Sequence, residues 1–527
     1  MPFKNENTHY LAAIKGEEEE FHERYEAAYK SLLERTGDSA LDYPNIVGGE
    51  EVISEKQYED ICPYNTSLVI GRFQRASEEE VAQGVEVAKS AFDSWSHKGF
   101  PLRIEIMERA AELIREEKFE LAAAVTLDNG KNRYEAIADV DEAIDFLVFY
   151  SDEMRRNHGF CQETTAPFPE EYTKSVMRPF GVWAAICPFN FPVAITTGMI
   201  VGALITGNTV VLKPSSPVPL PVYMVARLLH RAGVQEDALN FISASGSVVG
   251  NALITNPDVS GIVFTGSKAV GYDILRNSVV NHPRPVIAEM GGKNPIIVTS
   301  KANLDWALEG AVRSAFGFGG QKCSASSRLY VQDDIYDEFV EKLAERVRSL
   351  KIGDPSQKEN YLGPVIHQEA YEDFKRYAEM AERDGDVLAG GQVLTDDGLD
   401  GGYFVQPTVV AGLPEDHYLI KNELFLPLVC VQRFETLAEA LEKANDVEYG
   451  LTAGIFSDSD EEIEYFFRHI QAGVVYSNRI RGGSTGAMVG GQPFGGWKSS
   501  GSTGKGAGGT HYLTQFLREQ SRTICDN

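Results

Sequence analysis

The sequence predicts an α/β protein with two doubly wound domains, each a parallel sheet covered by helices on both faces. Its 527 residues exceed the length at which one hydrophobic core usually suffices, so more than one domain is expected. From residue 181 onward, short apolar runs alternate with amphipathic helices, the pattern of βαβ units with right-handed crossovers. An apolar content of 43% and a charged content of 24% are those of an ordinary globular protein.

The first part of the chain is predicted to be mainly helical. An opening helix carries an apolar stripe at helical spacing, formed by Phe21, Tyr25, Ala28 and Leu32. A short edge hairpin is expected over 43–49. Ser77 and Glu80 have the spacing of a capping box and begin a second helix. Two further long helices are predicted over 102–126 and 133–156.

The first α/β domain follows a turn-rich stretch, 159–174, which is predicted to form a hairpin arm outside the core. The expected strands of this domain are 182–187, 209–213, 239–242, 261–264 and 286–289. The helices expected between them are 195–204, 220–232, 248–255 and 269–277. Because open parallel sheets bind ligands beyond the carboxyl ends of their strands, a site is expected at that edge.

A second alternating set begins after Gly291 and predicts a second α/β domain. Its expected strands are 295–298, 327–330, segments near Val387 and Phe404, 429–434 and 474–477. Its expected helices are 304–316, 335–350, 370–384 and 437–445. The tail is rich in glycine over 482–509 and ends in an extended or short helical segment, 512–523, suited to docking on a partner.

The charge and the cysteines exclude several classes of protein. A net charge of −28 argues against nucleic acid or an anionic membrane as partner. The uncharged run 179–212 is interrupted by prolines and glycines, so it is interpreted as interior rather than membrane-spanning. The six cysteines are scattered without metal-ligand spacing, so no metal or disulfide is expected and a reducing compartment fits. No apolar leader is visible, and a cytoplasmic location is expected.

The stretch 316–325 presents Cys323 after a glycine-rich bend. Glycines allow turns that side chains forbid, so the thiol could be held on a loop between packed elements. A thiolate is a good nucleophile, and a partly exposed polar loop could lower the thiol pKa. The alternative is a small buried hydrophobic residue, the usual role of a single cysteine.

Two other polar residues follow expected strands. Asn190 could donate its amide to a developing oxyanion, although a turn asparagine is the alternative. Glu289 ends an apolar strand before a Gly-Gly turn, so it is a candidate general base whose pKa burial could raise. The alternative for Glu289 is a helix cap.

The cofactor side is predicted from two stretches. The segment 264–271 reads as a strand, a glycine turn and a helix start, and helix N-termini bind phosphate through free N–H groups and the dipole. Lys213 follows a buried strand and could reach a ribose or phosphate, although a surface lysine is the default. Each stretch by itself is only weak evidence for a cofactor site.

In order, the motifs are Pro-Phe-Asn-Phe-Pro, Lys-Pro-Ser-Ser, Phe-Thr-Gly-Ser, Glu-Met-Gly-Gly-Lys, Gly-Gln-Lys-Cys and Pro-Phe-Gly-Gly. Together they resemble the aldehyde dehydrogenase superfamily from about residue 40 to the C-terminus. Gly-Gln-Lys-Cys-Ser-Ala with the stretches 484–496 and 507–513 is similar to the 1-pyrroline-5-carboxylate dehydrogenase branch, also called L-glutamate γ-semialdehyde dehydrogenase.

The resemblance implies that Cys323 attacks the aldehyde to give a thiohemiacetal. The Asn190 side chain and the Cys323 backbone N–H would hold the oxyanion, and hydride would leave to the nicotinamide. Glu289 would then activate the water that hydrolyses the thioester. Covalent capture divides one difficult step into two easier ones, and a preorganised donor pair accelerates both.

The resemblance also implies a set of cofactor-binding residues: Ile186, Pro188, Lys213, Ser216, Gly266, Ser267, Gly271, Glu423 and Phe425. Glu423 matches the residue that holds the nicotinamide ribose, while Leu426 replaces the glycine usual in that motif. Ser216 stands where members that prefer NAD often place a glutamate on the adenosine ribose. NAD is therefore expected, with some tolerance of NADP.

The implied substrate carries an aldehyde at one end and a carboxylate at the other. The branch places that carboxylate against the N–H groups of Gly486 and Ala487 and the Ser324 hydroxyl, with Phe191 and Phe494 as apolar walls. The reaction expected is oxidation of L-glutamate γ-semialdehyde to L-glutamate in proline degradation. The alternatives are another semialdehyde such as succinic semialdehyde, acyl transfer to coenzyme A, and a non-catalytic binding protein.

With the resemblance, the expected domains acquire roles. Residues 1–158 and 179–290 would form a Rossmann-like dinucleotide-binding domain, and 291–481 the catalytic domain. Residues 159–178 and 503–527 would form a bridging arm that exchanges strands between subunits, so a homo-oligomer of two or more chains is expected.

Overall fold

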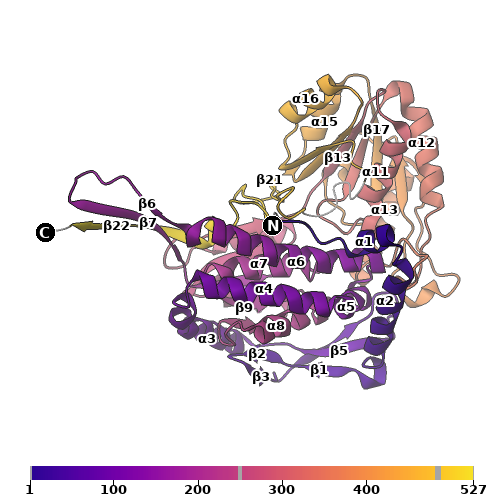
Figure 1. The fold of residues 1–527 in the computed structure, drawn as a ribbon. Coiled ribbons are helices and arrows are strands. Elements are labelled where there is room, and N and C mark those ends of the chain that lie inside the picture. The colour runs from indigo at the N-terminus through magenta and orange to yellow at the C-terminus, as the bar shows by residue number, and fades with distance from the viewer. Residues whose placement is uncertain (1–2, 247–251, 481–487, 526–527) are drawn as a thin grey trace.

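The computed structural model describes residues 3–246, 252–480 and 488–525, and two seven-stranded sheets form its two lobes (Figure 1). In the first sheet the strands lie in the order β12 (Val286–Glu289), β11 (Val259–Thr265), β8 (Val182–Ile186), β9 (Thr209–Lys213), β10 (Leu239–Phe241), β2 (Asn45–Val47) and β3 (Glu50–Val52). The first five are parallel, and β2 with β3 forms the expected antiparallel edge hairpin.

Helices cover both faces of this sheet, which confirms the doubly wound prediction. The helices are α3 (Glu78–Ser96) and α10 (Lys268–Asn277) on one face, and α7 (Ala194–Ile205) and α8 (Leu220–Ala232) on the other. Alternate residues of one strand follow the two faces: Val211 packs with α3, whereas Val210 and Leu212 pack with α7 and α8. The capping box of Ser77 with Glu80 starts α3 as predicted.

Three long helices form an outer layer over α7 and α8: α4 (Phe100–Glu116), α5 (Lys118–Asn129) and α6 (Arg133–Arg156). The prediction of one helix over 102–126 was wrong, because the chain turns at Glu117. α4 buries one face, while α5 is buried on nearly every side between α2 (Glu18–Leu33), α6 and α8. A straight continuation of α4 could not enter that space.

The second sheet has the order β15 (Asp386–Ala389), β16 (Thr408–Ala411), β17 (Leu428–Phe434), β14 (Ser326–Gln332), β13 (Asn294–Val298), β19 (Thr452–Phe456) and β20 (Val474–Ser477). All neighbours are parallel except β15 with β16. α11 (Leu304–Phe316) and α12 (Asp333–Arg348) cover one face. The other face carries α13 (Gln368–Asp384), α14 (Tyr418–Lys421), α15 (Leu437–Asn445) and α16 (Asp460–His469).

The strand predicted near Phe404 was misplaced. The Phe404 carbonyl accepts the Leu394 N–H at 2.9 Å, and the Gln406 N–H donates to Gln392 at 2.9 Å, so this segment pairs locally. Pro407, which has no N–H to donate, separates it from β16 in the sheet.

Smaller elements complete the body. The opening segment forms α1 (Thr8–Lys15) and α2, whose buried face includes three of the four predicted stripe residues, Phe21, Tyr25 and Leu32. A three-stranded sheet that the sequence did not predict has the order β1 (Leu41–Tyr43), β5 (Val69–Gln74) and β4 (Gln57–Ile61). A short pair joins β18 (Tyr449–Gly450) to β21 (Trp497–Lys498). Residues 248–251 of the helix predicted over 248–255 lie outside the described residues, and 252–254 are helical.

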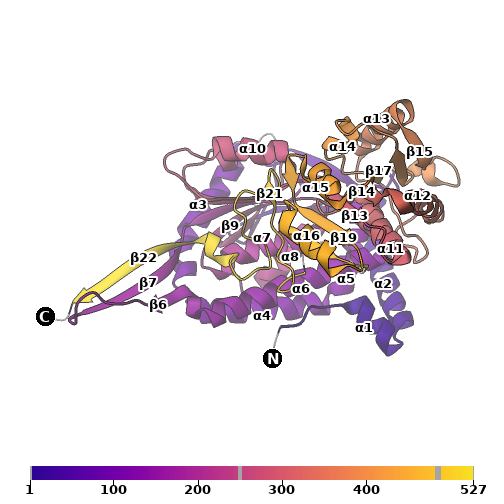
Figure 2. The same ribbon diagram turned by 90° about the horizontal axis from the view of Figure 1, so that it is seen from above.

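An arm of three antiparallel strands projects from the first lobe, as both ribbon views show (Figures 1 and 2). Its strands are β6 (Cys161–Glu163), β7 (Glu171–Pro179) and β22 (Leu517–Cys525), with β7 in the centre. The hairpin predicted over 159–174 is therefore confirmed, and the chain's last described strand joins it. Exposed apolar side chains on the arm include Phe168, Tyr172 and Ile524.

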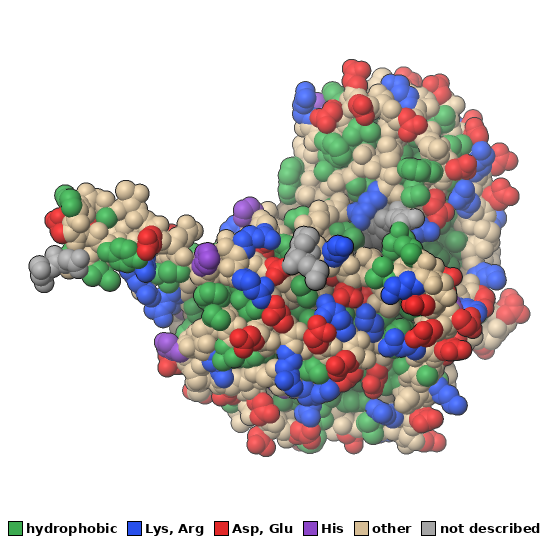
Figure 3. Space-filling view, viewed as in Figure 1, with side chains coloured by type: hydrophobic (Ala, Val, Ile, Leu, Met, Phe, Trp, Pro, Cys, Tyr) green, Lys and Arg blue, Asp and Glu red, His purple; other side chains and the backbone are tan. Residues whose placement is uncertain are grey.

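The uncharged run 179–212 forms β8, α7 and β9, and nearly all of its side chains are buried. Within the described part of the chain, no helix combines the length and apolarity needed to cross a membrane. Acidic and basic side chains are interspersed over the face shown in Figure 3, so the net charge of −28 is not gathered there into one patch.

Candidate active site

Cys323 lies on the turn between α11 and β14, and close backbone contacts fix that turn. Phe318, Gly319 and Gly320 all have positive φ, of 48°, 61° and 69°. A Cβ at Gly320 would lie 2.5 Å from the Leu426 carbonyl oxygen, so only glycine fits there. Gly320 is thus required by both conformation and space, and Gly319 by conformation.

Asn294 clamps the backbone on either side of the thiol. Its amide nitrogen donates to the carbonyls of Cys323 at 2.7 Å and Ala325 at 2.8 Å, and its amide oxygen accepts the Thr452 N–H at 3.0 Å. A Cβ at Gly292 would lie 2.5 Å from the Cys323 carbonyl oxygen. The loop that carries Cys323 is therefore hydrogen-bonded to Asn294 of β13 and, through this side chain, connected to Thr452 of β19.

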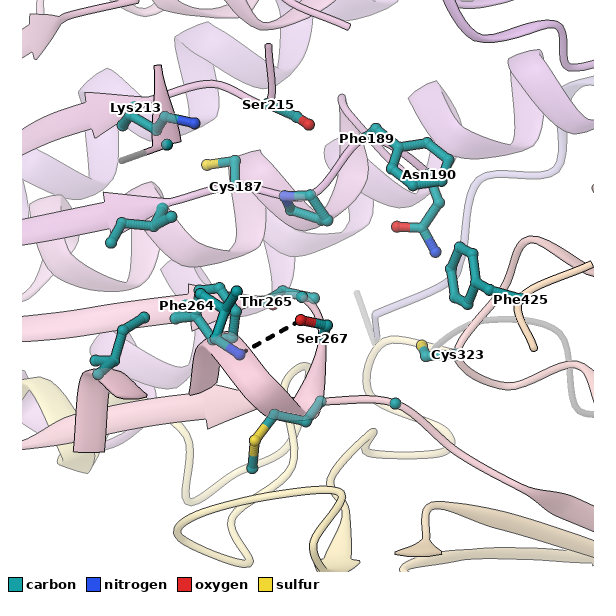
Figure 4. A pocket seen from close by; sticks show the side chains of 18 of the residues that line it. Cys187, Phe189, Asn190, Lys213, Ser215, Phe264, Thr265, Ser267, Cys323 and Phe425 are labelled. Carbon is teal, nitrogen blue, oxygen red and sulfur yellow. Dashed lines mark hydrogen bonds between the residues drawn. The ribbon is translucent and has the colours of Figure 1, made fainter. Parts of the chain in front are cut away.

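A cavity of about 500 Å³ opens at the carboxyl ends of β8, β9 and β11, the edge predicted from the sheet topology (Figure 4). Lys213, Cys187 and Ser215 lie at one end of it, and Asn190, Phe425 and Cys323 lie at the other. Its walls are mainly apolar, and a few polar groups converge on it, as in sites that bind large organic ligands.

Most of the predicted cofactor residues line this cavity: Ile186, Pro188, Lys213, Gly266, Ser267, Glu423 and Phe425. Gly271 lies behind the wall, where a Cβ would come within 2.4 Å of the Met290 sulfur. Ser216 lies outside the lining and its hydroxyl donates to the Ala244 carbonyl at 3.4 Å, while its neighbour Ser215 faces the cavity.

Sequence reasoning did not single out several other lining residues: Cys187, Phe189, Ser215, Gly246, Ile254, Phe264, Thr265, Val270, Ile274, Met290 and Gly291. Most are apolar or small and look like core residues. The available signal was position, since most lie within or next to a predicted motif at a strand end.

The first turn of α10 faces the cavity. The Ser267 hydroxyl caps this helix by accepting the Val270 N–H at 3.4 Å, drawn as the dashed line in Figure 4. Burial lowers the pKa of Lys213 from its ordinary value. A helix N-terminus and a buried lysine both favour an anionic ligand.

Glu423 reaches the cavity beside the Gly291–Gly292 turn. Its carboxylate accepts the Gly292 N–H at 2.9 Å, and burial raises its pKa to about 7. Phe425 has a φ of 58°, and Leu426 is buried in the core of the second lobe. The loop thus accommodates leucine at the position where the family motif usually has glycine.

A second, smaller cavity of about 50 Å³ lies on the other side of the thiol. Three of the residues expected on the substrate side, Phe191, Phe494 and Ser324, line it together with the candidate base Glu289. Cys323 lines both cavities, so its sulfur stands at their junction. Gly486 and Ala487, expected to bind the substrate carboxylate, lie outside the described residues.

The ionisable groups at this junction are strongly perturbed. Burial raises the pKa of Glu289 to about 8, although its carboxylate accepts the Gly496 N–H at 3.2 Å. Burial, with the charges of Glu423 and Glu289, also raises the pKa of the Cys323 thiol. The thiol is therefore neutral here, and forming a thiolate requires a proton acceptor. Asn190 is 3% exposed beside it.

Phe191 is held by a buried ion pair that sequence reasoning missed. The Lys131 ammonium lies 3.6 Å from the centre of the Phe191 ring and 2.9 Å from Asp139. Asp139 also accepts the Ala194 N–H at 2.7 Å. Both partners of the ion pair are fully buried, and such pairs persist only when each charge is matched.

The described residues hold no group of three or more His, Cys, Asp or Glu side chains arranged to bind a metal ion. The site instead combines a nucleophile, a buried carboxyl, an amide donor and a cavity large enough for part of a dinucleotide.

Comparison with known proteins gives concordant results. The model of the aldehyde dehydrogenase family matches residues 51–521. A 1-pyrroline-5-carboxylate dehydrogenase of Geobacillus sp. (strain WCH70) is 39% identical over 508 residues, covering 95% of this chain and 96% of that protein. A structure of 1-pyrroline-5-carboxylate dehydrogenase from Thermus with bound NAD has a TM-score of 0.93 at 35% identity, covering 100% of this chain and 99% of that one.

A betaine aldehyde dehydrogenase from Staphylococcus aureus in complex with NAD⁺ is more distant, with a TM-score of 0.89 at 29% identity, covering 95% of this chain and 97% of that one. Fold, motifs and sequence similarity agree along almost the whole length. The chain belongs to the aldehyde dehydrogenase family.

Proposed function

We propose that this enzyme oxidises L-glutamate γ-semialdehyde, the open form of 1-pyrroline-5-carboxylate, to L-glutamate with a nicotinamide cofactor. The observation that carries the proposal is the position of Cys323 between a large cavity and a small one. The identity of the substrate is inferred from relatives named 1-pyrroline-5-carboxylate dehydrogenase, which are 39% and 38% identical over 95% of the chain.

The larger cavity would hold part of a nicotinamide dinucleotide. It offers the first turn of α10 and Lys213 for the phosphates and ribose, and Glu423 for the nicotinamide ribose. The packing of Gly271 against Met290 keeps α10 close to the sheet. When bound, the cofactor supplies a hydride acceptor.

The chain's own residues would carry the other steps. The Cys323 thiol gives its proton to the Glu289 carboxylate, which releases it to solvent, and the sulfur bonds to the aldehyde carbon. The new oxyanion is held by the Asn190 amide and the Cys323 backbone N–H. Once hydride has left, a thioester remains on the sulfur. Glu289, whose pKa is about 8, takes a proton from water that attacks this thioester and releases the carboxylate product.

The small cavity suits a short aliphatic chain. Phe191 and Phe494 would flank it, and Ser324, 1% exposed, would face the carboxylate end. Gly486 and Ala487 remain proposed anchors for that carboxylate. NAD with some use of NADP remains the proposed cofactor preference, because serine at position 216 has no carboxylate to repel a 2′-phosphate.

The domain roles and the oligomer are proposed as well. Residues 1–158 with 179–290 would bind the dinucleotide, and 291–481 would carry the nucleophile. Residues 159–178 with 503–527 would bridge subunits of a homo-oligomer. The exposed apolar side chains of the arm formed by β6, β7 and β22 support this role, whereas Tyr512, Leu513 and Phe516 of the same range belong to the core of the first lobe.

The test is a nicotinamide absorbance assay with 1-pyrroline-5-carboxylate, with succinic semialdehyde and propanal as competing substrates. We expect kcat/KM for 1-pyrroline-5-carboxylate to exceed that for succinic semialdehyde by at least about tenfold. A preference for succinic semialdehyde would contradict the proposed substrate, and dependence of product release on coenzyme A would contradict the proposed hydrolysis.

A further inference from the structure

A third cavity, of about 490 Å³, lies outside the small cavity, and the segment ahead of α1 forms part of its wall. Phe191 and Glu142 line both the small cavity and this outer one, so the two spaces meet at those side chains. Asn5 on the segment and Met488 on the glycine-rich tail also line the outer cavity. A substrate with its aldehyde at Cys323 would extend from the small cavity toward this space.

Two acidic residues of α6 bind the segment. Asp145 accepts the Asn5 side-chain amide at 2.8 Å and the Glu6 N–H at 2.7 Å. One helical turn away, Asp141 accepts both the N–H and the hydroxyl of Thr8, the first residue of α1, at 2.7 and 2.6 Å, and so holds the end of the segment. These four hydrogen bonds fix the segment along α6.

Basic side chains of the neighbouring helices hold the same segment from the other side. Arg115 pairs with Glu6 at 2.7 Å, and the Lys118 ammonium donates to the Thr8 hydroxyl at 2.6 Å. Figure 1 shows the result, in which the segment runs from the yellow tail along α6 to α1.

The segment also contacts the tail directly. The Asn5 amide that donates to Asp145 donates a second hydrogen bond to the Val489 carbonyl, at 3.0 Å. Phe3 packs on Phe149 with ring centres 5.3 Å apart, and its ring would lie 3.0 Å from a Cβ at Gly490. Val489 is fully buried, so this contact point is fixed.

The part of the tail that begins at this contact serves three places in the site. Met488 lines the outer cavity, Phe494 lines the small cavity, and the Gly496 N–H donates to the Glu289 carboxylate at 3.2 Å. A displacement of Val489 would therefore also shift Met488 and Phe494, which line the cavities that the end of the substrate distant from the aldehyde would contact.

We propose that Asn5 is a positioning residue for the substrate: by joining α6 to the Val489 carbonyl, it holds the tail segment 488–496 against the substrate path. The inference rests on the proposed function for the identity of the substrate. Asn5 lines neither the small cavity beside the thiol nor the large cavity proposed for the cofactor. Its effect is therefore on binding of the end of the substrate that is distant from the aldehyde.

The experiment compares the full-length wild-type enzyme with Asn5→Ala and Asn7→Ala. Asn7 is the matched control, since it lines the same cavity but is exposed, and its amide donates only to the Asn5 carbonyl at 3.2 Å among the hydrogen bonds described. Asn5→Ala should raise KM for glutamate semialdehyde about fivefold, the cost of a lost hydrogen bond, with kcat within about twofold. KM for propanal, which is too short to reach the outer wall, should stay unchanged.

Hydrogen exchange followed by mass spectrometry supplies a readout independent of substrate. Amides of 488–496 should exchange faster in Asn5→Ala and at the wild-type rate in Asn7→Ala. Equal rises in KM for both aldehydes, no change in either, or unchanged exchange would overturn the proposal. Wild-type enzyme that oxidised propanal but not glutamate semialdehyde would refute the proposed function, and the exchange comparison would then decide this inference alone.

Discussion

Two cysteines face the large cavity, but only Cys323 also lines the small one. We predict that Cys323→Ser lowers kcat by about a thousandfold or more, since a serine hydroxyl without an adjacent strong base is a poor nucleophile. The matched variant Cys187→Ser alters a thiol whose pKa burial raises to about 12. It should retain most of the activity in the same absorbance assay, and loss of activity in both variants would contradict a single nucleophile.

Glu289 gives the reaction a pH dependence. Burial raises its pKa to about 8, so the carboxylate that can accept a proton from water forms as pH rises through that value. The kcat should increase from pH 7, reach half of its maximum near pH 8 and level off above about pH 9. Glu289→Gln should remove this limb and leave a burst of reduced cofactor followed by turnover at least about a hundredfold slower.

The same group also affects stability, with the opposite sign. Its folded pKa lies above the unfolded value of 4.5, so the stability that proton binding contributes is present below pH 4.5 and is lost as pH rises through 8. Thermal melts should therefore show Glu289→Gln gaining on the wild type between pH 5 and pH 9. Glu153→Gln, which alters another carboxyl of raised pKa, should leave the activity limb in place.

At the scale of elements, the turn after β12 packs closely against the turn before β14. A Cβ at Gly292 would lie 2.5 Å from the Cys323 carbonyl oxygen and close to the Asn294 amide. We expect Gly292→Ala to displace the thiol and lower kcat by about a hundredfold, because small misplacements of reacting groups are costly. Gly401→Ala, where nothing lies within 4 Å of the new Cβ, is the control and should keep wild-type kinetics.

Elements with strong local signals were predictable. The bounds of α6 and α8 agree with the helical pattern, and the capping box marks the start of α3. The turn at Glu117 could not be predicted, because it depends on how α5 packs among its neighbouring helices rather than on a proline or glycine. The same holds for the site: motif residues such as Asn190 could be named, while Ile274 and the Lys131–Asp139 pair depend on tertiary packing.

At the scale of the whole molecule, the arm leaves Phe168, Tyr172 and Ile524 exposed at 58%, 40% and 61%. We predict that ending the chain after Leu517, which removes most of β22, lowers the molar mass measured by light scattering toward that of one chain. Ile14→Ser, which alters an apolar residue of α1 exposed at 65%, should leave the mass unchanged. A truncated protein with the mass of the full-length protein would count against a bridging role.

The arm has a thermodynamic consequence. Leu517 and Met177 pack on the core of the first lobe, but the three strands otherwise bury few side chains. Free energy that stabilises them must therefore come in part from association. Stability gained by association follows mass action. The melting temperature of this enzyme should therefore fall on dilution, and a single value would describe it only at a stated protein concentration.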